Sequence, residues 1–157
     1  MSRARTDLVA LLRSAAVVFA VAVVVNYVWE LAQAPLYVGM TSLGAAWWHC
    51  FVASLGDGVL VLIIFAAVWA VTGRVRWYAS PGAAGYATML VVGLAIAVAV
   101  EWIALEVLGR WAYTDRMPLV PGLDIGLAPV AQMLVLPPLI FRIVTALEAK
   151  SIQGETK

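Results

Sequence analysis

Four long apolar segments limit what this chain can fold into. They cover about residues 8–34, 43–72, 81–109 and 125–147, and each is long enough to cross the roughly 30 Å hydrocarbon core of a bilayer as an α-helix. Hydrophobic residues make up 64% of the chain and charged residues 12%, a composition that is too apolar for a water-soluble domain. The sequence therefore predicts an all-α, integral membrane four-helix bundle.

Local signals mark where the segments begin and end. Pro35 ends the first segment, and Thr41 and Ser42 are N-cap residues for the second, which stops at Gly73. Ser80-Pro81 supplies an N-cap and a first-turn proline for the third segment. Each segment is therefore expected to fold as a separate helix with short connections.

The fourth segment contains Pro137-Pro138, and we expect a kink there because two adjacent prolines remove two backbone donors. Residues 8–148 then form a single transmembrane domain, and residues 149–157 form a cytoplasmic tail. As an alternative, the first segment is a signal peptide cleaved after Ala32-Gln33-Ala34. Its apolar run is longer than a signal-peptide core, and Pro35 would follow the scissile bond, so we expect a membrane span.

The basic residues set the expected orientation. Eight of the ten Lys and Arg residues precede the first segment, separate the second from the third, or lie toward the C-terminus, whereas the opposite side holds Arg110 and Arg116. The positive-inside rule predicts a multi-pass protein of the bacterial inner membrane with both termini in the cytoplasm. Aromatic residues are expected to form an outer belt of Trp47, Trp48, Trp111 and Tyr113 and an inner belt of Trp69, Trp77 and Tyr78.

Acidic residues within the apolar segments indicate a functional site. Glu30, Asp57 and Glu101 lie inside these segments, where an acidic side chain costs roughly 2.5–3.5 kcal/mol on insertion scales. Such residues normally face the interior of the bundle. Glu106 lies five residues after Glu101, on another face of the helix, and is expected to reach toward the membrane surface.

One polar residue from each helix falls at a similar depth. At 1.5 Å per residue, these four lie roughly 9–14 Å from the outer ends of their helices: Asn26, Asp57, Glu101 and Gln132. Asn26 and Gln132 also fit a purely structural role as interhelical hydrogen-bond partners. Their common depth instead predicts a shared polar pocket that opens toward the periplasm.

Helical spacing adds further residues to this pocket. Asn26, Glu30 and Gln33 form one stripe on the first helix, and His49 stands above Asp57 on the second with Ala53 between them. On the third helix, a groove of small residues that favours close helix contact ends in a carboxylate: Gly93, Ala97 and Glu101. His49 alone would also fit a histidine at the membrane interface.

Acid/base chemistry is the function that this pattern favours. A carboxyl group in a low-dielectric site can hold a proton near neutral pH, so Glu101 and Asp57 are candidate catalytic residues and His49 is a candidate proton relay. An acid beneath a lipid-accessible opening suits an apolar substrate with a double bond, such as an isoprenoid. The candidate substrate-binding residues are Asn26, Glu30, Gln33, Trp111, Tyr113 and Gln132.

Other ligand classes have little support in the sequence. One histidine without an HExxH or HxxxH pair does not predict a metal site, and the single cysteine, Cys50, gives no zinc-ligand spacing. We expect no cofactor and no nucleic acid, because the basic residues form no patch. A membrane lipid or isoprenoid is the expected ligand, and the sequence leaves a homo-oligomer open.

The segment from Gly109 to Gln132 is the most distinctive stretch of the chain. Its prolines and glycines rigidify a loop that is rich in aromatic rings. If the segment is an interfacial anchor, Trp111 and Tyr113 lie at headgroup level. If the segment is a lid, these two side chains cover the pocket. The sequence supports both interpretations equally.

This segment carries two resemblances. An acid eight positions before Gly-x-Trp-x-Tyr, followed by Met-Pro and then Gln, resembles a pattern in uncharacterised small bacterial four-helix integral membrane proteins, as do Trp29-Glu30 and His49…Asp57. It is also similar to the membrane domain of carotenoid lycopene cyclases, where Pro-x-Glu-Glu follows the aromatic motif. On that resemblance Glu101 matches the first acid, whereas Gln132 replaces a glutamate and cannot protonate an olefin. The similarity covers residues 101–132 and implies a shared fold.

Three functions therefore stay open. The first is a membrane enzyme, or lapsed enzyme, that acts on an isoprenoid or lipid. The second is a small proton- or cation-coupled transporter, although four spans without an inverted repeat suit alternating access poorly unless the protein is a dimer. The third is a non-catalytic accessory subunit of a membrane assembly.

Overall fold

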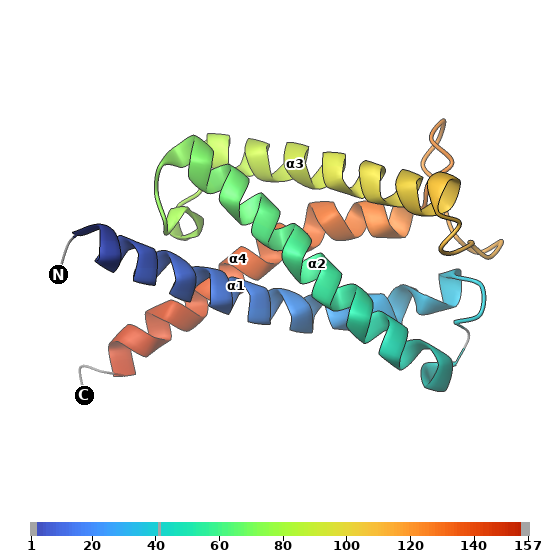
Figure 1. The fold of residues 1–157 in the computed structure, drawn as a ribbon, viewed down its shortest axis with the longest axis horizontal. Helices are drawn as coiled ribbons and strands as arrows, with labels where there is room; N and C mark the ends of the chain where they lie inside the picture. Colours follow the sequence, from blue (N-terminus) through green and yellow to red (C-terminus); the bar gives the residue numbers. More distant parts are fainter. Residues whose placement is uncertain (1–2, 41, 155–157) are drawn as a thin grey trace.

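The computed structural model describes residues 3–40 and 42–154, with side chains for residues 8–40 and 42–150. Four long helices account for most of this part of the chain: α1 (Arg3–Gln33), α2 (Leu43–Thr72), α3 (Gly82–Trp102) and α4 (Leu127–Gly154) (Figure 1). The described residues contain two isolated β-bridges and no strand. The predicted all-α, four-helix class is confirmed.

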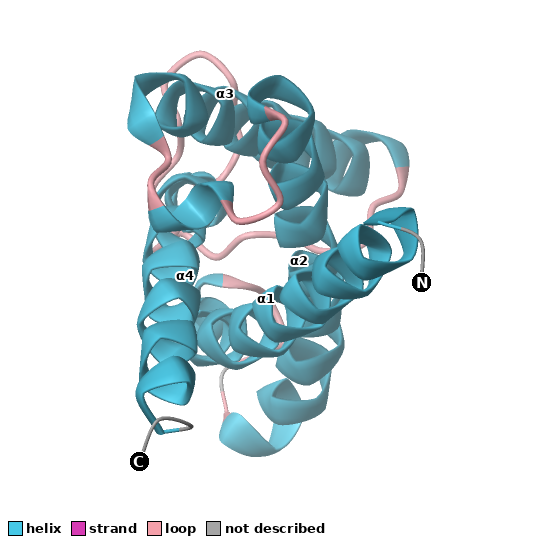
Figure 2. Cartoon of the chain, turned by 90° about the vertical axis from the view of Figure 1, so that its left-hand side faces the viewer, coloured by secondary structure: helices cyan, strands magenta, loops and turns pink. Residues whose placement is uncertain are grey.

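The helices form a ring in which each one packs against two neighbours. α1 and α3 each contact both α2 and α4, and Figure 2 shows this arrangement along the bundle. Both termini and the connection between α2 and α3 lie at one end, which we call the terminal end. The connections at residues 34–42 and 108–126 lie at the opposite end, which we call the loop end.

All four helices are long and apolar enough to cross a membrane. Their outward faces carry large hydrophobic side chains, such as Val91 at 67% exposure and Val28 at 65%. Apolar surface of this extent is typical of a protein that is solvated by lipid. The ends of the chain and the α2–α3 connection meet at the terminal end. The segments that run to this end carry five basic residues: Arg13, Arg74, Arg76, Arg142 and Lys150.

Short-range interactions define the helix ends. Ser42 caps α2, because its Oγ accepts from the Ala45 N–H at 3.3 Å, whereas Thr41 lies outside the described residues. α2 stops at Gly73, whose φ of 67° is the left-handed conformation that glycine tolerates. The expected Ser80 cap on α3 is wrong: Pro81 occupies the cap position, and the Ser80 N–H bonds back to Trp77 O at 3.0 Å.

α3 ends in a wider turn directly after Glu101. Residues Ile103–Val107 form a π-helical segment, in which Leu108 N–H bonds to Ile103 O at 3.0 Å. Segments of this kind recur at functional sites because they reorient the side chains around them. Glu106 lies in this segment and is exposed, as its spacing from Glu101 predicts.

Pro137 and Pro138 lie inside α4, which continues through both residues. Figure 1 shows that α4 changes direction partway along its length. A bend is the expected response, because each proline removes a backbone donor and its ring displaces the preceding turn.

The terminal end of the bundle is packed with aromatic side chains. Trp77 and Tyr78 are 0% and 3% exposed, and the Trp77 ring centroid lies 4.5 Å from that of Phe141. Trp77 also donates its indole N–H to Phe65 O at 3.2 Å. The expectation that Trp77 and Tyr78 belong to an inner interfacial belt is therefore wrong, because the 73–81 connection turns back into the bundle.

α3 and α4 approach closely at Gly93. A Cβ atom added at Gly93 would lie only 2.5 Å from the carbonyl oxygen of Met133, so no larger residue fits without moving α4. Ala97 and Glu101, which follow at intervals of four, are also buried. The predicted small-residue groove therefore carries Glu101 into the interior, beside α4.

Candidate functional site

A cavity of about 130 Å³ lies inside the bundle, toward the loop end. All four helices and the connections at the loop end contribute to it. Its lining includes these residues from α1 and the segment that follows: Glu30, Gln33, Tyr37 and Met40. α2 and α3 contribute His49, Cys50, Ala53, Asp57, Leu60, Ala97, Val100 and Glu101. The remaining lining residues are Trp111, Pro129, Gln132 and Met133.

Gln132 of α4 joins three helices at the floor of this cavity. Its amide nitrogen donates to Asn26 Oδ1 at 2.9 Å and to Asp57 Oδ2 at 3.0 Å, and its amide oxygen accepts from Gln33 Nε2 at 2.9 Å. Gln132 and Asn26 are 2% and 0% exposed. Every polar atom of the Gln132 side chain is thus paired, which fixes its amide orientation.

Gln33 extends this network along α1. Its amide nitrogen also donates to Glu30 Oε1 at 2.7 Å, and its amide oxygen accepts from the Trp29 indole N–H at 3.1 Å. Trp29, Glu30 and Gln33 share one face because they are three and four residues apart on a helix. The carboxyl group of Glu30 is therefore held toward the cavity by an amide that α4 itself orients.

Glu30 and Asp57 form a pair of carboxyl groups. They come from α1 and α2, and both line the cavity. Two ionised carboxylates in one small apolar cavity repel each other. The two amides Gln33 and Gln132 each donate to one member of the pair.

Glu101 lies across the cavity and has a different set of partners. Tyr113 donates its phenol O–H to Glu101 Oε2, and the Gly126 N–H donates to the Tyr113 oxygen at 2.8 Å. Burial and the hydrogen bond to Glu101 raise the pKa of Tyr113 above its ordinary value. Tyr113 therefore remains a protonated donor at physiological pH, and it stabilises the charged form of Glu101.

The two connections at the loop end are joined above the cavity, and we call this joined segment the strap (residues 36–38 and 112–114). Val38 N–H bonds to Ala112 O, and Thr114 N–H bonds to Leu36 O, both at 2.9 Å. Within the strap, the Tyr37 and Tyr113 rings meet edge to face at 5.6 Å between centroids. This pairing makes the 109–126 loop a cover for the cavity, and it favours the lid interpretation.

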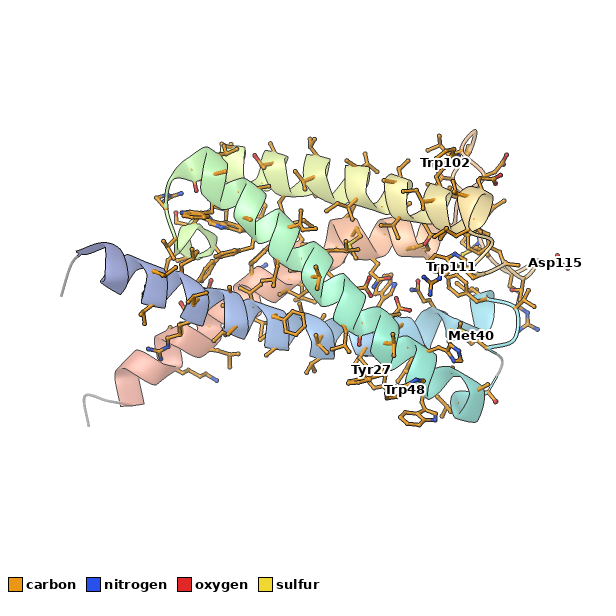
Figure 3. All side chains as sticks on the ribbon, viewed as in Figure 1. Tyr27, Met40, Trp48, Trp102, Trp111 and Asp115 are labelled. Carbon is orange, nitrogen blue, oxygen red and sulfur yellow. The ribbon has the colours of Figure 1, made fainter. Side chains whose placement is uncertain are left out.

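Tyr37 of the strap and Trp111 of the 109–126 loop carry polar atoms at the cavity. Burial, together with the carboxyl groups of Glu101 and Glu30, raises the pKa of Tyr37, so its phenol stays neutral. The indole N–H of Trp111 is buried and has no acceptor among the residues that the structure describes. Figure 3 shows Trp111 at the loop end with Met40, whereas Trp48 and Trp102 lie on the outer faces of α2 and α3.

His49 lies at the loop-end rim of the cavity and is exposed. Its Nδ1 is 3.2 Å from the Ala45 carbonyl oxygen. A carbonyl oxygen only accepts, so this contact requires the proton on Nδ1 and leaves Nε2 as the acceptor in the neutral ring. His49 is thus placed between the loop end of α2 and the carboxyl group of Asp57, which lies about two turns further along the same helix.

The cavity is acidic, and His49 at its rim is the one basic side chain in its lining. Its lining contains three carboxyl groups and neither Lys nor Arg. Among the described residues, no group of three His, Cys, Asp or Glu side chains has the arrangement of a metal site. The negative charge that these groups can carry is therefore neutralised by protons or by a ligand rather than by side chains.

The structure brings together all nine residues that the sequence singles out. Seven line the cavity: Glu30, Gln33, His49, Asp57, Glu101, Trp111 and Gln132. The other two, Asn26 and Tyr113, bond directly to Gln132 and Glu101. Sequence reasoning missed Tyr37 and Cys50, which also line the cavity. The position of Tyr37 two residues after the helix-ending Pro35 was the available signal, because the connection that follows this helix lies at the end of the bundle.

The chemistry open to this site follows from its size, its carboxyl groups and its apolar surroundings. Its polar groups are held by hydrogen bonds between helices, and the lid is held by pairing between connections. Comparisons with protein-family models, with curated proteins and with solved structures found no match for this chain.

Proposed function

We propose that the protein is a multi-pass protein of the bacterial inner membrane whose cavity faces the periplasm and carries out acid/base chemistry on an isoprenoid or similar lipid. The observation that carries this proposal is the meeting of three carboxyl groups from three helices around one small cavity whose lining contains neither Lys nor Arg. Ionisable groups are costly in a membrane-spanning bundle and are retained mainly for function.

The hydrogen bonds divide the carboxyl groups into an acid and a base. The Glu30–Asp57 pair is the acid: Gln33 and Gln132 hold both carboxyl groups at the cavity, where a proton on one of them relieves the repulsion between two ionised carboxylates. Glu101 accepts from Tyr113 and is the base, because this donor favours its charged form. His49 restores protons from water, since it lies at the rim nearest to solvent.

Such a site suits proton transfer to and from carbon. Protonation of a double bond by the acid pair forms a C–H bond and leaves a carbocation, which the nearby carboxylate stabilises. Removal of a different proton by Glu101 then restores a double bond at a new position. The sequence of steps is redox-neutral, so it needs no cofactor and consumes no water.

The size of the cavity limits what enters it. An apolar cavity of about 150 Å³ accommodates a benzene molecule, so the 130 Å³ here holds about one isoprene unit. A complete isoprenoid does not fit. The reacting unit therefore lies in the cavity while the remainder of the molecule stays in the membrane.

Deuterium incorporation from heavy water tests the proposal on a whole lipid mixture, so the substrate need not be identified first. The protein is reconstituted in inner-membrane lipid extract in D₂O, and the lipids are analysed by mass spectrometry. We expect carbon-bound deuterium in one lipid class. Asp57→Asn and Glu101→Gln should lower the rate by roughly 10²–10⁴-fold, the usual contribution of general acid–base catalysis.

Glu106→Gln is the matched control, because Glu106 lies on α3's exposed extension, outside the cavity. This variant should incorporate deuterium at the wild-type rate. Absence of incorporation by the wild-type protein, or equal rates in all three variants, would overturn the proposal. A pH-gradient-driven flux that Asp57→Asn abolishes, without deuterium in any lipid, would instead identify a transporter.

A further inference from the structure

We propose that the cavity opens sideways between α2 and α3 and receives a hydrocarbon chain directly from the membrane. This inference rests on the proposed membrane location and names the route and the ligand class for the same site. The ligand is a single-chain lipid whose polar head stays at the loop end, near His49, and whose neutral chain passes between the two helices.

The lining residues on α2 and α3 face each other across this opening. Ala53 on α2 and Val100 on α3 both line the cavity and are both exposed, Val100 at 36%. A residue can satisfy both conditions only at a rim, where the cavity meets the surface. Figure 1 shows that α2 and α3 diverge toward the loop end, the direction in which this rim lies.

The other sides of the cavity are closed. Toward α1, the buried side chains of Ala34, Ala46 and Cys50 pack together with Tyr27 and Leu31. This cluster fills the space between α1 and α2 and leaves no apolar route there.

The remaining two sides are closed by polar and backbone contacts. Gln132 and Met133 of α4 are 2% and 5% exposed and form the floor. The strap, in which Tyr37 is 8% exposed, covers the loop end except at the polar rim formed by exposed His49, which offers no apolar route. The gap between α2 and α3 is therefore the side through which an apolar chain can reach the carboxyl groups.

The residues at this opening are small and apolar. Ala53 lies one turn from His49 and one turn from Asp57, so the rim passes from a polar side chain to a methyl group to a carboxyl group along one face of α2. By helix geometry, His49 and Asp57 are roughly 12 Å apart along the axis. A lipid headgroup at His49 thus places a chain segment, and not the head, beside the acids.

Electrostatics favour the same orientation. The carboxyl groups of Glu30, Asp57 and Glu101 line the cavity without Lys or Arg, and His49 lies only at its rim, so an anionic phosphate or carboxylate headgroup is repelled from the interior. A neutral chain meets no such repulsion. A cationic centre formed on that chain by protonation is stabilised there.

Cys50 provides a reporter, because it is the only cysteine in the chain and it lines the cavity. In proteoliposomes, dodecyl methanethiosulfonate dissolves in the bilayer and forms a mixed disulfide with an accessible thiol, with release of methanesulfinate. We expect this lipid-soluble reagent to modify Cys50, as measured by intact-protein mass. The charged sulfonatoethyl reagent, which stays in water, should react much more slowly.

Substitutions at the rim test the route. Ala53→Phe and Val100→Phe should each slow modification by the dodecyl reagent by roughly tenfold or more, because a phenyl ring overfills the gap. The controls are Val59→Phe on α2 and Val91→Phe on α3, whose side chains are 50% and 67% exposed and lie outside the cavity. Both controls should react at the wild-type rate.

Faster modification by the charged reagent, or equal rates in the rim and control variants, would overturn the sideways route. Val100→Phe decides the question if Ala53→Phe fails to accumulate, because the Val100 side chain already reaches the surface. The labelling does not require catalysis. Rim-dependent labelling without deuterium incorporation would support the route and refute the acid/base function, and the reverse pattern would do the opposite.

Discussion

At the scale of single residues, the site depends on neutral amides that hold acidic groups in place. Gln132 donates to Asp57 and accepts from Gln33, which itself donates to Glu30. An amide both donates and accepts, so it can connect two carboxyl groups that would otherwise repel each other. A glutamate at position 132 would add charge and lose this capacity.

Replacement of Gln132 by methionine should therefore destabilise the fold. Met has a similar length but removes the hydrogen bonds that Gln132 makes with Asn26, Gln33 and Asp57, which costs roughly 1–3 kcal/mol. Equilibrium unfolding of the detergent-solubilised protein by SDS measures the loss. Leu139→Met, on the outward face of α4 at 45% exposure, is the control and should leave the midpoint unchanged. Equal midpoints for both variants would contradict the structural role of Gln132.

Tyr113 gives a pH dependence with a definite sign. Its folded-state pKa is raised above the usual tyrosine value of about 10, first by burial and then by Glu101. A raised pKa means that the unfolded chain releases this proton first, so stability is full below pH 10 and falls as pH rises above it. Thermal unfolding at pH 8 and at pH 10.5 should show this loss, and Tyr113→Phe should reduce it. An equal loss in the variant would assign the effect to other groups.

The sequence predicted the acidic and amide residues of the site but not Tyr37. Asn26, Asp57, Glu101 and Gln132 could be assigned a depth because each lies within a helix of regular rise. Tyr37 lies in a connection, and its position depends on pairing with Tyr113, far away in sequence. Such pairing follows from tertiary structure, which no local periodicity encodes.

At the scale of elements, contact between α3 and α4 sets where Glu101 lies. Gly93 permits this contact, since a Cβ there would meet Met133 O at 2.5 Å. The sequence predicted this close face from the repeat of small residues. The prediction that Trp77 and Tyr78 belong to an interfacial belt was wrong. Aromatic residues near a helix end fit a buried turn as well as they fit such a belt, so composition alone does not separate the two.

Two glycine substitutions separate packing from helix propensity. Gly93→Ala should destabilise the protein by roughly 1–3 kcal/mol through overpacking against α4. Gly56→Ala, on α2 with no atom within 4 Å of the added Cβ, should be neutral or stabilising by up to about 1 kcal/mol, because alanine favours a helix more than glycine does. SDS unfolding midpoints compare the two. A loss for Gly56→Ala as large as that for Gly93→Ala would refute the packing argument.

At the scale of the whole molecule, the two ends of the bundle differ in character. The terminal end is filled by Phe65, Trp77, Tyr78 and Phe141, whereas the loop end contains the polar network and the cavity. The packed apolar half thus supports a polar half, in which side chains from all four helices must keep fixed positions relative to one another. This division fits a scaffold that carries a site at one end.

The expected orientation can be tested on the intact protein. Fluorescent-protein fusions at either terminus should fluoresce in bacterial cells, because both termini are expected in the cytoplasm. Alkaline phosphatase inserted between Asp115 and Arg116, in the exposed part of the loop, should be active, since it folds only in the periplasm. Active phosphatase at a terminus, or an inactive loop insertion, would invert the topology.

The order in which the chain is made adds a consequence of the Gln132 network. α4 leaves the ribosome after α1, α2 and α3, and it supplies the amide that pairs with Asn26, Gln33 and Asp57. Until α4 packs against the first three helices, these side chains lack that partner. We therefore expect the polar network to form only when α4 docks, after the other three helices have been synthesised.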